Sequence, residues 1–429
     1  MSRTIVALST AVGRSAIAVV RMSGDDCVEI AKKIFSPFPC QPNLLKPGVL
    51  KTRNFDEHAM CVYFAAPRSY TGEDVVEFHC HGGTAVPQAV IEACLDSGAV
   101  MAQNGEFSKR AFINGKQNLT NAEGIIEMID AETVSAAKAG ANLLENKLGQ
   151  RVVQLQQTLL DVLSACEAAL DYPEEDLELP TAEQVRRQID DVCGALDGII
   201  STSALGKVAK YGIDVAIVGA PNVGKSSLLN ALLGSNRAIV SSVKGTTRDT
   251  LCESVFYRDI KFNFVDTAGL HDTADEVEAE GIRRAKVAAD SADVILYLVE
   301  DPSDDTSFPS NKPVIKIYNK SDLYSPPALK QNQLAISAKS GDVEQLKETL
   351  YKLFNAGDIQ NSDLLITNQR HLSCLRQTAD ILREGSPQDT LDVISSRIRR
   401  AWEKLGEITG TDAQEDVINN IYSKFCLGK

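Results

Sequence analysis

Residues 219–226, which read GAPNVGKS, constrain the fold of this 429-residue chain more than any other feature. They follow a β-rich run at 214–218 and precede a helical pattern at 227–233, which is the context that a phosphate-binding loop requires. The glycines allow backbone N–H groups to surround phosphate oxygens, and the helix N-terminus adds a favourable dipole there. Lys225 is placed to reach the β- and γ-phosphates, and the Ser226 hydroxyl to bind Mg²⁺. The chain is therefore expected to contain a nucleotide-binding α/β domain.

Three later motifs indicate that the nucleotide is GTP. Residues 266–269 (DTAG) and 319–322 (NKSD) each end a predicted strand, and 337–339 read SAK. The first motif is expected to supply a second Mg²⁺ carboxylate and to sense the γ-phosphate. The Asp322 carboxylate can accept hydrogen bonds from N1–H and the 2-amino group of guanine, a donor pair that adenine lacks. We therefore expect a guanine-nucleotide domain whose first switch lies at 245–249.

The residue after the DTAG motif is unusual for a Ras-type enzyme. Such enzymes place a Gln there to orient the attacking water, whereas this chain has Leu270. No arginine finger can be assigned in cis, and such a finger is worth about 10³–10⁵ in rate. Hydrolysis is therefore either very slow or assisted by another cation and another polar residue. The polar candidates, each of which also reads as a solvated charge on a helix face, are Asp275, Glu276, Glu278 and Glu280.

Four segments differ in their patterning, which predicts a multidomain protein of α/β and all-α parts. Residues 1–118 read as a small α/β unit, and 119–211 as a helical segment that includes one long helix with an apolar stripe over 144–170. Strands and helices alternate over 212–356, which predicts a mostly parallel sheet. Helical patterning returns over 357–429. An α/β unit flanked by helical segments suggests that it is inserted into a helical domain.

Composition and charge indicate the compartment and the binding partners that this chain is expected to have. The net charge is −14, and residues 119–213 carry 16 acidic against 7 basic groups, so a polyanion should avoid that segment. No run of about 18 apolar residues occurs, and the first residues, MSRTIVALST, resemble no signal or transit peptide. The ten Cys show no CxxC pair, which suggests free thiols in a reducing cytosol. We expect a cytoplasmic protein without membrane spans.

The chain resembles the MnmE (TrmE) family of bacterial tRNA-modification GTPases nearly from end to end. The resemblance rests on 21–24 (RMSG), 70–74 (YTGED), 81–83 (HGG), Asn222, 245–249 (GTTRD), 275–278 (DEVE) and 425–429 (FCLGK). Many GTPases share the nucleotide motifs, whereas FCLGK together with this N-terminal segment is specific to the family. The resemblance implies a folate-binding-like N-terminal domain that also forms a homodimer. It further implies a helical domain carrying an inserted Ras-like P-loop GTPase domain.

The same resemblance implies an activity that neither composition nor spacing could give. It implies a potassium-activated GTP hydrolase working with the FAD-dependent protein MnmG (GidA) in a heterotetramer. Together they would add an aminomethyl or carboxymethylaminomethyl group at C5 of the wobble uridine of certain tRNAs, with a tetrahydrofolate as the one-carbon donor. Because the acidity is concentrated in 119–213, the basic surface for tRNA is expected to come largely from the partner.

The expected GTP site joins the loops described above. Its residues are Asn222, Val223, Gly224, Lys225, Ser226, Ser227, Ser241, Ser242, Val243, Lys244, Gly245, Thr246, Thr247, Asp266, Thr267, Ala268, Gly269, Asn319, Lys320, Asp322, Ser337, Ala338 and Lys339. Ser226 and Thr247 are expected to bind Mg²⁺. By resemblance, K⁺ is held by Asn222, Ser241, Val243 and Thr246 and supplies the missing positive charge. Glu278 matches the family's catalytic Glu, which positions water through a second water.

The expected folate site also comes from the resemblance. Its ligand is of the 5-formyl-tetrahydrofolate type, and the matching positions are Arg21, Glu77, Lys116 and Lys429. A carboxylate such as Glu77 can read the guanine-like edge of a pterin, and Arg or Lys can bind the glutamate carboxylates. Cys426 is either a free thiol or a residue near the one-carbon chemistry. His79 and His81 share a strand face, but no further metal ligand is placed beside them.

Two other classes of protein remain as alternatives. One is a ribosome-assembly GTPase of the Era or Der type, which binds RNA without modifying it. Such factors carry KH-like modules with a GxxG loop, and none is found after residue 362. The other is a dimerisation scaffold, which the complete nucleotide motifs disfavour. The sequence does not identify the amine donor, the tRNAs chosen, the subunit's direct tRNA contacts, the role of Cys426 or the extent of G-domain movement.

Overall fold

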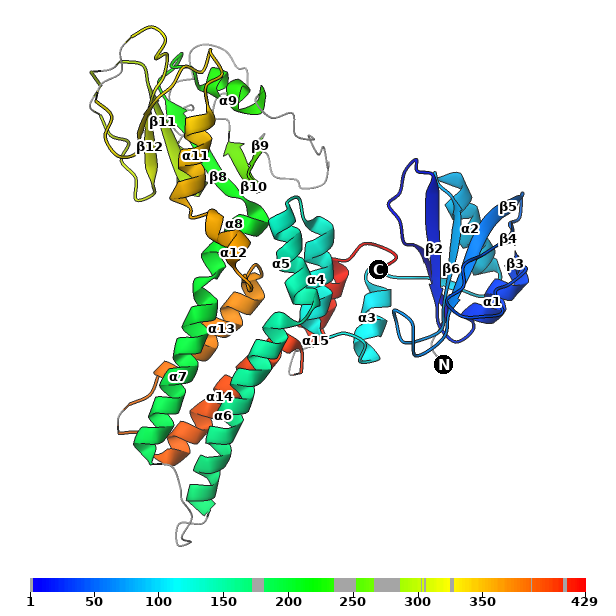
Figure 1. Ribbon diagram of the computed structural model, residues 1–429. Coiled ribbons are helices and arrows are strands. Elements are labelled where there is room, and N and C mark those ends of the chain that lie inside the picture. The colour runs from blue at the N-terminus through cyan, green and yellow to red at the C-terminus, as the bar shows by residue number, and fades with distance from the viewer. Residues whose placement is uncertain are drawn as a thin grey trace. The chain divides into compact units, whose positions relative to one another are not determined.

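The structure is a computed structural model that describes residues 3–171, 181–234, 252–265, 286–301, 303–304, 306–324, 328–386, 388–411 and 415–429. The chain forms two compact units (Figure 1). Unit 1 comprises Met1–Ile129, Gly140–Gly194 and Ser373–Lys429, and unit 2 comprises Asp130–Ala139 and Ala195–Leu372. Unit 1 is therefore built from three separate stretches of sequence, which agrees with the predicted insertion.

Unit 1 begins with a seven-stranded sheet of order β3-β4-β5-β6-β2-β1-β7. Its strands are β1 (Ile5–Leu8), β2 (Ile17–Ser23), β3 (Phe35–Ser36), β4 (Lys46–Lys51), β5 (Asp56–Phe64), β6 (Val75–His81) and β7 (Val100–Met101). Helices α1 (Cys27–Ile34) and α2 (Ala85–Asp96) cover one face, where Val20, Met22 and Phe78 are fully buried. The alternate residues of β2 and β6 consequently point to the opposite face. The predicted α/β unit at 1–118 is consistent with this sheet.

The remainder of unit 1 is helical. Its helices are α3 (Glu106–Ile113), α4 (Leu119–Asp130), α6 (Lys147–Asp171), α14 (Leu391–Thr409) and α15 (Glu415–Ser423), together with parts of α5 (Val134–Leu144), α7 (Ala182–Ser201) and α13 (Gln369–Arg383). Helices α6 and α14 run side by side (Figure 1), and Gln156 Nε2 donates to the Trp402 carbonyl at 3.1 Å. Thr181 and Gln184 form the reciprocal hydrogen bonds of a capping box, which fixes the start of α7.

The single long helix predicted over 144–170 is wrong at its N-terminal end. Leu144 is the last residue of α5, and α6 begins only at Lys147. The break occurs because Asn146 adopts a left-handed backbone conformation with φ of 61°, which Asn tolerates better than most residues. The apolar periodicity therefore continues in sequence across two separate helices, and Leu144 at the end of the first is exposed.

Unit 2 contains a six-stranded sheet of order β13-β12-β11-β8-β10-β9, parallel except for the β9–β10 pair. Its strands are β8 (Ile213–Gly219), β9 (Cys252–Tyr257), β10 (Ile260–Val265), β11 (Val294–Val299), β12 (Val314–Tyr318) and β13 (Gln333–Ala335). Its helices include α8 (Ser203–Tyr211), α9 (Lys225–Gly234), α11 (Glu344–Leu353) and α12 (Gly357–Asn361). The mostly parallel sheet predicted for 212–356 is confirmed.

Both faces of this sheet are buried, as parallel sheets require. Ile217 of β8 lies in a core cluster with Leu228 of α9 and Leu346 of α11. Its strand neighbour Ala216 lies in a second cluster with Ala288. Successive residues of one strand thus contact different layers, so unit 2 is a three-layer α/β domain.

The turn between β9 and β10 caps helix α5 within unit 2. Asp259 has φ of 66°, and its carboxylate accepts hydrogen bonds from Val134 N at 2.8 Å and Ser135 N at 2.7 Å. The Ser135 hydroxyl donates to the same carboxylate at 2.6 Å, and Thr133 Oγ1 accepts from Ala136 N at 3.0 Å. The first three amide groups of α5, which have no partner inside the helix, are therefore all paired.

We expect Asp259→Ala to speed amide exchange in the first turn of α5. Loss of a helix cap costs about 0.5–2 kcal/mol, which corresponds to roughly 2- to 30-fold faster exchange of Val134 and Ser135. Hydrogen–deuterium exchange of the whole chain measures this. Asp259→Asn is the matched control, because it keeps one acceptor and tolerates positive φ. Equal exchange in the two variants would contradict the assignment of the cap.

One described helical segment, Glu183–Tyr211, meets the length and composition of a membrane span. The mean hydropathy of its most apolar window is 1.2, and 39 % of that window is buried. A core helix of a folded domain meets the same criteria, so this segment is weak evidence for a span.

Candidate functional site

The phosphate-binding loop lies between β8 and α9, as its sequence predicts. Asn222 and Gly224 have φ of 63° and 101°, and a Cβ atom on Gly224 would lie 2.1 Å from Asn319 Nδ2. Glycine is therefore required at Gly224 both for backbone conformation and for space. Lys225 begins α9, and its ammonium donates to the carbonyls of Gly219 at 3.0 Å and Ala220 at 2.9 Å. The loop thus holds the lysine at a helix N-terminus, where anions bind favourably.

Asn319 joins this loop to the base-recognition loops. Its side chain is 2 % exposed and donates from Nδ2 to the Val223 carbonyl at 2.7 Å. Its Oδ1 accepts from Ala338 N at 3.1 Å. The Tyr324 hydroxyl donates to the Asn319 carbonyl. Asn319 consequently fixes three loops relative to one another, and its amide keeps a second N–H and a second lone pair for a ligand.

Asp322 and Ser337 form the part of the site that can read a base. The Ser337 hydroxyl donates to Asp322 Oδ1 at 2.6 Å, and this hydrogen bond lowers the pKa of the Asp322 carboxyl. The carboxylate is solvent-accessible, so it remains ionised and free to accept further donors from a ligand. Lys320, with φ of 60°, places its ammonium 2.8 Å from Glu300 Oε2. The structure therefore brings 319–322 and 337–339 together as predicted.

We expect Ser337→Ala to shift the acid limb of GDP binding to higher pH. The predicted recognition of guanine by Asp322 requires the ionised carboxylate, and the Ser337 hydrogen bond keeps the pKa of that carboxyl below its usual range. Without that bond the carboxyl protonates at higher pH, so GDP affinity falls earlier as the pH is lowered. Titration of GDP affinity between pH 3 and 7 measures the shift. Ser340→Ala, which removes a neighbouring hydroxyl that donates to the Ser337 carbonyl, is the control. Identical pH profiles for Ser337→Ala and the wild type would contradict the role of this bond.

Several predicted GTP-site residues lie outside the described part of the chain. These are Ser241–Thr247, Asp266–Gly269 and the catalytic candidate Glu278. Their assignment rests on sequence. The described residues Asn222, Ser226 and Ser227 lie in the loop or the first turn of α9, where the predicted contacts with phosphate and cations require them.

A second cluster of predicted residues lies on the sheet of unit 1. Arg21 of β2 and Glu77 of β6 are cross-strand partners, and Arg21 Nε lies 2.7 Å from Glu77 Oε1. Their side chains are only 18 % and 15 % exposed, respectively, so the pair is partly shielded from water. His79 Nε2 lies 3.5 Å from the other oxygen, Glu77 Oε2. This nitrogen is buried and makes no hydrogen bond to any residue that the structure describes. A donor or acceptor from a ligand would satisfy that nitrogen.

The segment 425–429 contacts the same pair. The Gly428 carbonyl accepts from the Ser9 hydroxyl at 3.0 Å and from Arg21 Nη1 at 3.5 Å. Gly428 has φ of 93°, and a Cβ atom there would lie 2.1 Å from the Leu8 carbonyl oxygen. Burial and the nearby charge of Arg21 lower the pKa of Lys429. The structure therefore brings Lys429 near Arg21, which is itself paired with Glu77, although these residues are far apart in sequence.

Lys116 and Cys426 differ from these three. Lys116 donates to the Pro67 carbonyl at 3.0 Å, and its side chain packs at Gly72 rather than on the Arg21–Glu77 pair. Cys426 is exposed. Among the described residues no group of three His, Cys, Asp or Glu side chains could hold a metal. Sequence reasoning gave no role to Tyr70 and Phe107, whose rings lie over Arg21, although Tyr70 begins the motif YTGED on which the family resemblance partly rests.

The three-layer fold of unit 2, its phosphate-binding loop and its base-reading carboxylate define a P-loop GTPase of the guanine-nucleotide class. Two family models match the chain, the TrmE N-terminus over residues 4–116 and the MnmE helical domain over 119–426. The chain belongs to the MnmE (TrmE) family. It is similar to proteins named tRNA modification GTPase MnmE from Lactobacillus acidophilus and Shouchella clausii, with 37 % identity to each and 99 % of this chain covered. The alignments cover 98 % and 99 % of those relatives.

Solved structures resemble this chain over a smaller region. A structure of Aquifex aeolicus Era Y63A bound to GDP and aluminium fluoride is 28 % identical. The match covers 41 % of this chain and 68 % of that one, with a TM-score of 0.24. The family assignment accordingly rests on the sequence matches.

Proposed function

We propose that this chain is the GTP-hydrolysing subunit of an enzyme that modifies C5 of the wobble uridine of certain tRNAs. Membership of the family makes the chain a GTPase of tRNA modification. Two hydrogen bonds carry the assignment to GTP. Asn319 bonds the phosphate-binding loop at the Val223 carbonyl, and Asp322 accepts from the Ser337 hydroxyl. That arrangement presents a carboxylate to a base beside a phosphate cradle, which suits guanine and excludes adenine.

In this proposal the chain's own loops position GTP for hydrolysis. The loop amides and Lys225 bind the phosphates, and the Ser226 hydroxyl would hold Mg²⁺. Asn222 would hold K⁺ together with Ser241, Val243 and Thr246, and the cation would supply positive charge where an arginine finger is absent. The positive φ of Asn222 allows the chain to turn sharply within the phosphate-binding loop, where Asn222 would face the phosphates. Glu278 would orient the attacking water.

The cluster on the sheet of unit 1 fits a folate of the 5-formyl-tetrahydrofolate type. The buried, unpaired His79 Nε2 beside Glu77 supports a ligand at this place. Glu77 would accept the donors of the pterin edge, with its ion pair to Arg21 keeping it ionised, and Lys429 would attract the anionic glutamate end. Lys116, which donates to the Pro67 carbonyl, would have to turn from that partner to reach the same ligand. When bound, the folate supplies the one-carbon unit. Burial and the charge of Arg21 lower the pKa of Lys429, which means that they disfavour its charged form. A bound anion would favour that charged form and so offset the cost.

The assembly and the compartment are part of the same proposal. The chain would act as a homodimer joined through the N-terminal domain and as a heterotetramer with MnmG (GidA) in the cytoplasm. The net charge of −14 supports a division in which the partner provides most of the basic surface for tRNA.

Two measurements test the proposal. Nucleoside mass spectrometry of tRNA from a deletion strain should show loss of the C5-modified wobble uridine, and restoration by the wild-type chain. Unchanged modification would reject the tRNA role and favour a ribosome-assembly switch. The GTPase rate in KCl should exceed that in NaCl at equal ionic strength, because Na⁺ is too small for a K⁺ site built from Asn222 and a loop. Equal rates would reject the potassium site and leave the tRNA role intact.

A further inference from the structure

The guanidinium of Arg21 lies between two aromatic rings. The Arg21 Cζ atom is 5.3 Å from the centroid of the Tyr70 ring and 5.8 Å from that of the Phe107 ring. Phe107 belongs to α3 and is fully buried, whereas Tyr70 belongs to the loop between β5 and β6. Both distances lie within the range of favourable cation–π contacts. The orientation of Arg21 toward Glu77 consequently depends on where this loop is held.

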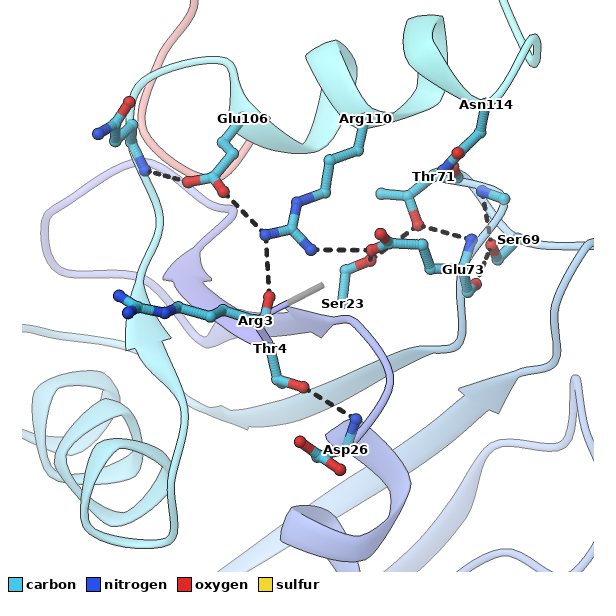
Figure 2. A network of polar contacts seen from close by, with 12 residues as sticks. Arg3, Thr4, Ser23, Asp26, Ser69, Thr71, Glu73, Glu106, Arg110 and Asn114 are labelled. Carbon is cyan, nitrogen blue, oxygen red and sulfur yellow. Dashed lines mark hydrogen bonds and ion pairs between the residues drawn. The ribbon is translucent and has the colours of Figure 1, made fainter. Parts of the chain in front are cut away.

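An ion-pair clamp holds one side of the loop. Arg110 of α3, 14 % exposed, places Nη1 at 3.0 Å from Glu73 Oε2 and Nη2 at 2.9 Å from Glu106 Oε1. Arg110 Nη2 also donates to the Arg3 carbonyl at 2.9 Å. Figure 2 shows Arg110 between the two carboxylates, with Ser23 donating to Glu73 from the other side at 2.8 Å. One guanidinium thus connects α3, the loop and the start of β1.

Buried hydroxyl groups hold the residues next to Tyr70. Ser23 Oγ and Thr71 Oγ1 are 2.8 Å apart, and neither residue is exposed. Asn114 Nδ2 donates to the Thr71 carbonyl at 2.8 Å (Figure 2). The Tyr70 hydroxyl lies 2.6 Å from the hydroxyl of Ser108, which is also fully buried. The Tyr70 ring is therefore fixed through its own hydroxyl and through the backbone that follows it.

We propose that Tyr70 is a positioning residue of the folate site, and that the Arg110–Glu73 clamp keeps its ring against Arg21. This inference rests on the proposed folate function. An arginine on a sheet face loses rotamer entropy when a ligand fixes it. The two rings remove that freedom before binding, so Arg21 and Glu77 are preorganised for the ligand. Tyr70 acts through Arg21 and does not itself touch the reacting atoms.

The test compares variants that separate the π face from the volume of the side chain. Tyr70→Phe keeps the ring and loses the bond to Ser108, whereas Tyr70→Leu fills similar space without a π face. Calorimetry of the whole chain with 5-formyl-tetrahydrofolate should give nearly wild-type affinity for Phe and roughly 3- to 30-fold weaker binding for Leu. In an Arg21→Met background, exchanging Tyr70 for Leu should have no further effect. A merely structural role would weaken binding in both backgrounds.

The outcomes separate this inference from the folate proposal. Equal affinities of the Phe and Leu variants, or additive losses with Arg21→Met, overturn the positioning role. If the wild-type chain does not bind 5-formyl-tetrahydrofolate, the folate proposal fails. In that case crystal structures of the wild type and Tyr70→Leu decide the positioning role. A retained 2.7 Å contact between Arg21 Nε and Glu77 Oε1 in the variant would overturn it, and a lost contact would support it.

Discussion

Replacing Asp322 by Asn is expected to lower GTP affinity by up to about 10⁴-fold, because the 2-amino donor of bound guanine then faces another donor instead of an acceptor. The Asn amide presents a donor to the 2-amino group of guanine, where the carboxylate presented an acceptor. Xanthine carries an oxygen at that position, so the variant should bind XTP more tightly than GTP. Competition binding with a fluorescent nucleotide measures both affinities.

Xanthine selectivity separates a change of specificity from a loss of structure. A misfolded domain would bind neither GTP nor XTP, whereas an altered base contact lowers the affinity for GTP and raises that for XTP. Ser337 must then accept from the Asn amide instead of donating to a carboxylate, which its hydroxyl allows. Unchanged preference for GTP in Asp322→Asn would show that this residue does not read the base.

Gly428→Ala is expected to displace residues 425–429 from the sheet of unit 1. The added Cβ atom would lie 2.1 Å from the Leu8 carbonyl oxygen, and φ of 93° is itself unfavourable for alanine. Displacement removes the Gly428 carbonyl from Ser9 and Arg21 and withdraws Lys429 from the proposed ligand. Loss of one charge-assisted hydrogen bond predicts roughly 10- to 100-fold weaker binding of 5-formyl-tetrahydrofolate, measured by calorimetry.

Gly98→Ala is the matched control for this variant. Gly98 also has positive φ, at 117°, but a Cβ atom there would meet nothing within 4 Å. It therefore reproduces the backbone strain without displacing any neighbour. Hydrogen exchange of residues 425–429 should rise in Gly428→Ala and stay at the wild-type level in Gly98→Ala. Similar exchange in both variants would contradict the docking of this segment.

The sequence predicted those elements that local chemistry specifies. Strand β11 is an uninterrupted apolar run, and β8 and β12 are apolar apart from Asp214 and Lys316. The phosphate-binding loop fixes the turn and the helix that follow β8. The capping residue Thr181 and the terminating Gly410, with φ of 94°, likewise act within a few residues. Strand β4 was not predicted, because it contains Pro47, which is disfavoured within strands, and is stabilised by pairing with β5.

The parts of the site that sequence could not supply depend on distant contacts. The Gly428 carbonyl and Arg21 are 407 residues apart, and no local pattern connects them. Asn319 was predicted as a base-site residue, but its bonds to Val223 and Ala338 required the fold. Tyr70 is an ordinary aromatic residue until the fold places its ring over Arg21, and Arg110 is an ordinary helix cation until the loop brings Glu73 to it. Motif spacing therefore identified the residues expected to bind the ligands, and the tertiary structure identified the contacts that hold those residues in place.

The interrupted construction of unit 1 has a consequence for synthesis on the ribosome. Unit 2 is almost continuous in sequence, whereas α6 packs on α14, which begins 220 residues after α6 ends. At about 5–20 residues per second, α6 waits roughly 10–45 s for its partner while unit 2 is free to fold. A nascent chain therefore exposes the apolar stripe of α6, and it cannot complete the Arg21 cluster until residue 428 has emerged. Chaperone binding is accordingly expected to concentrate on residues 147–171 of stalled chains.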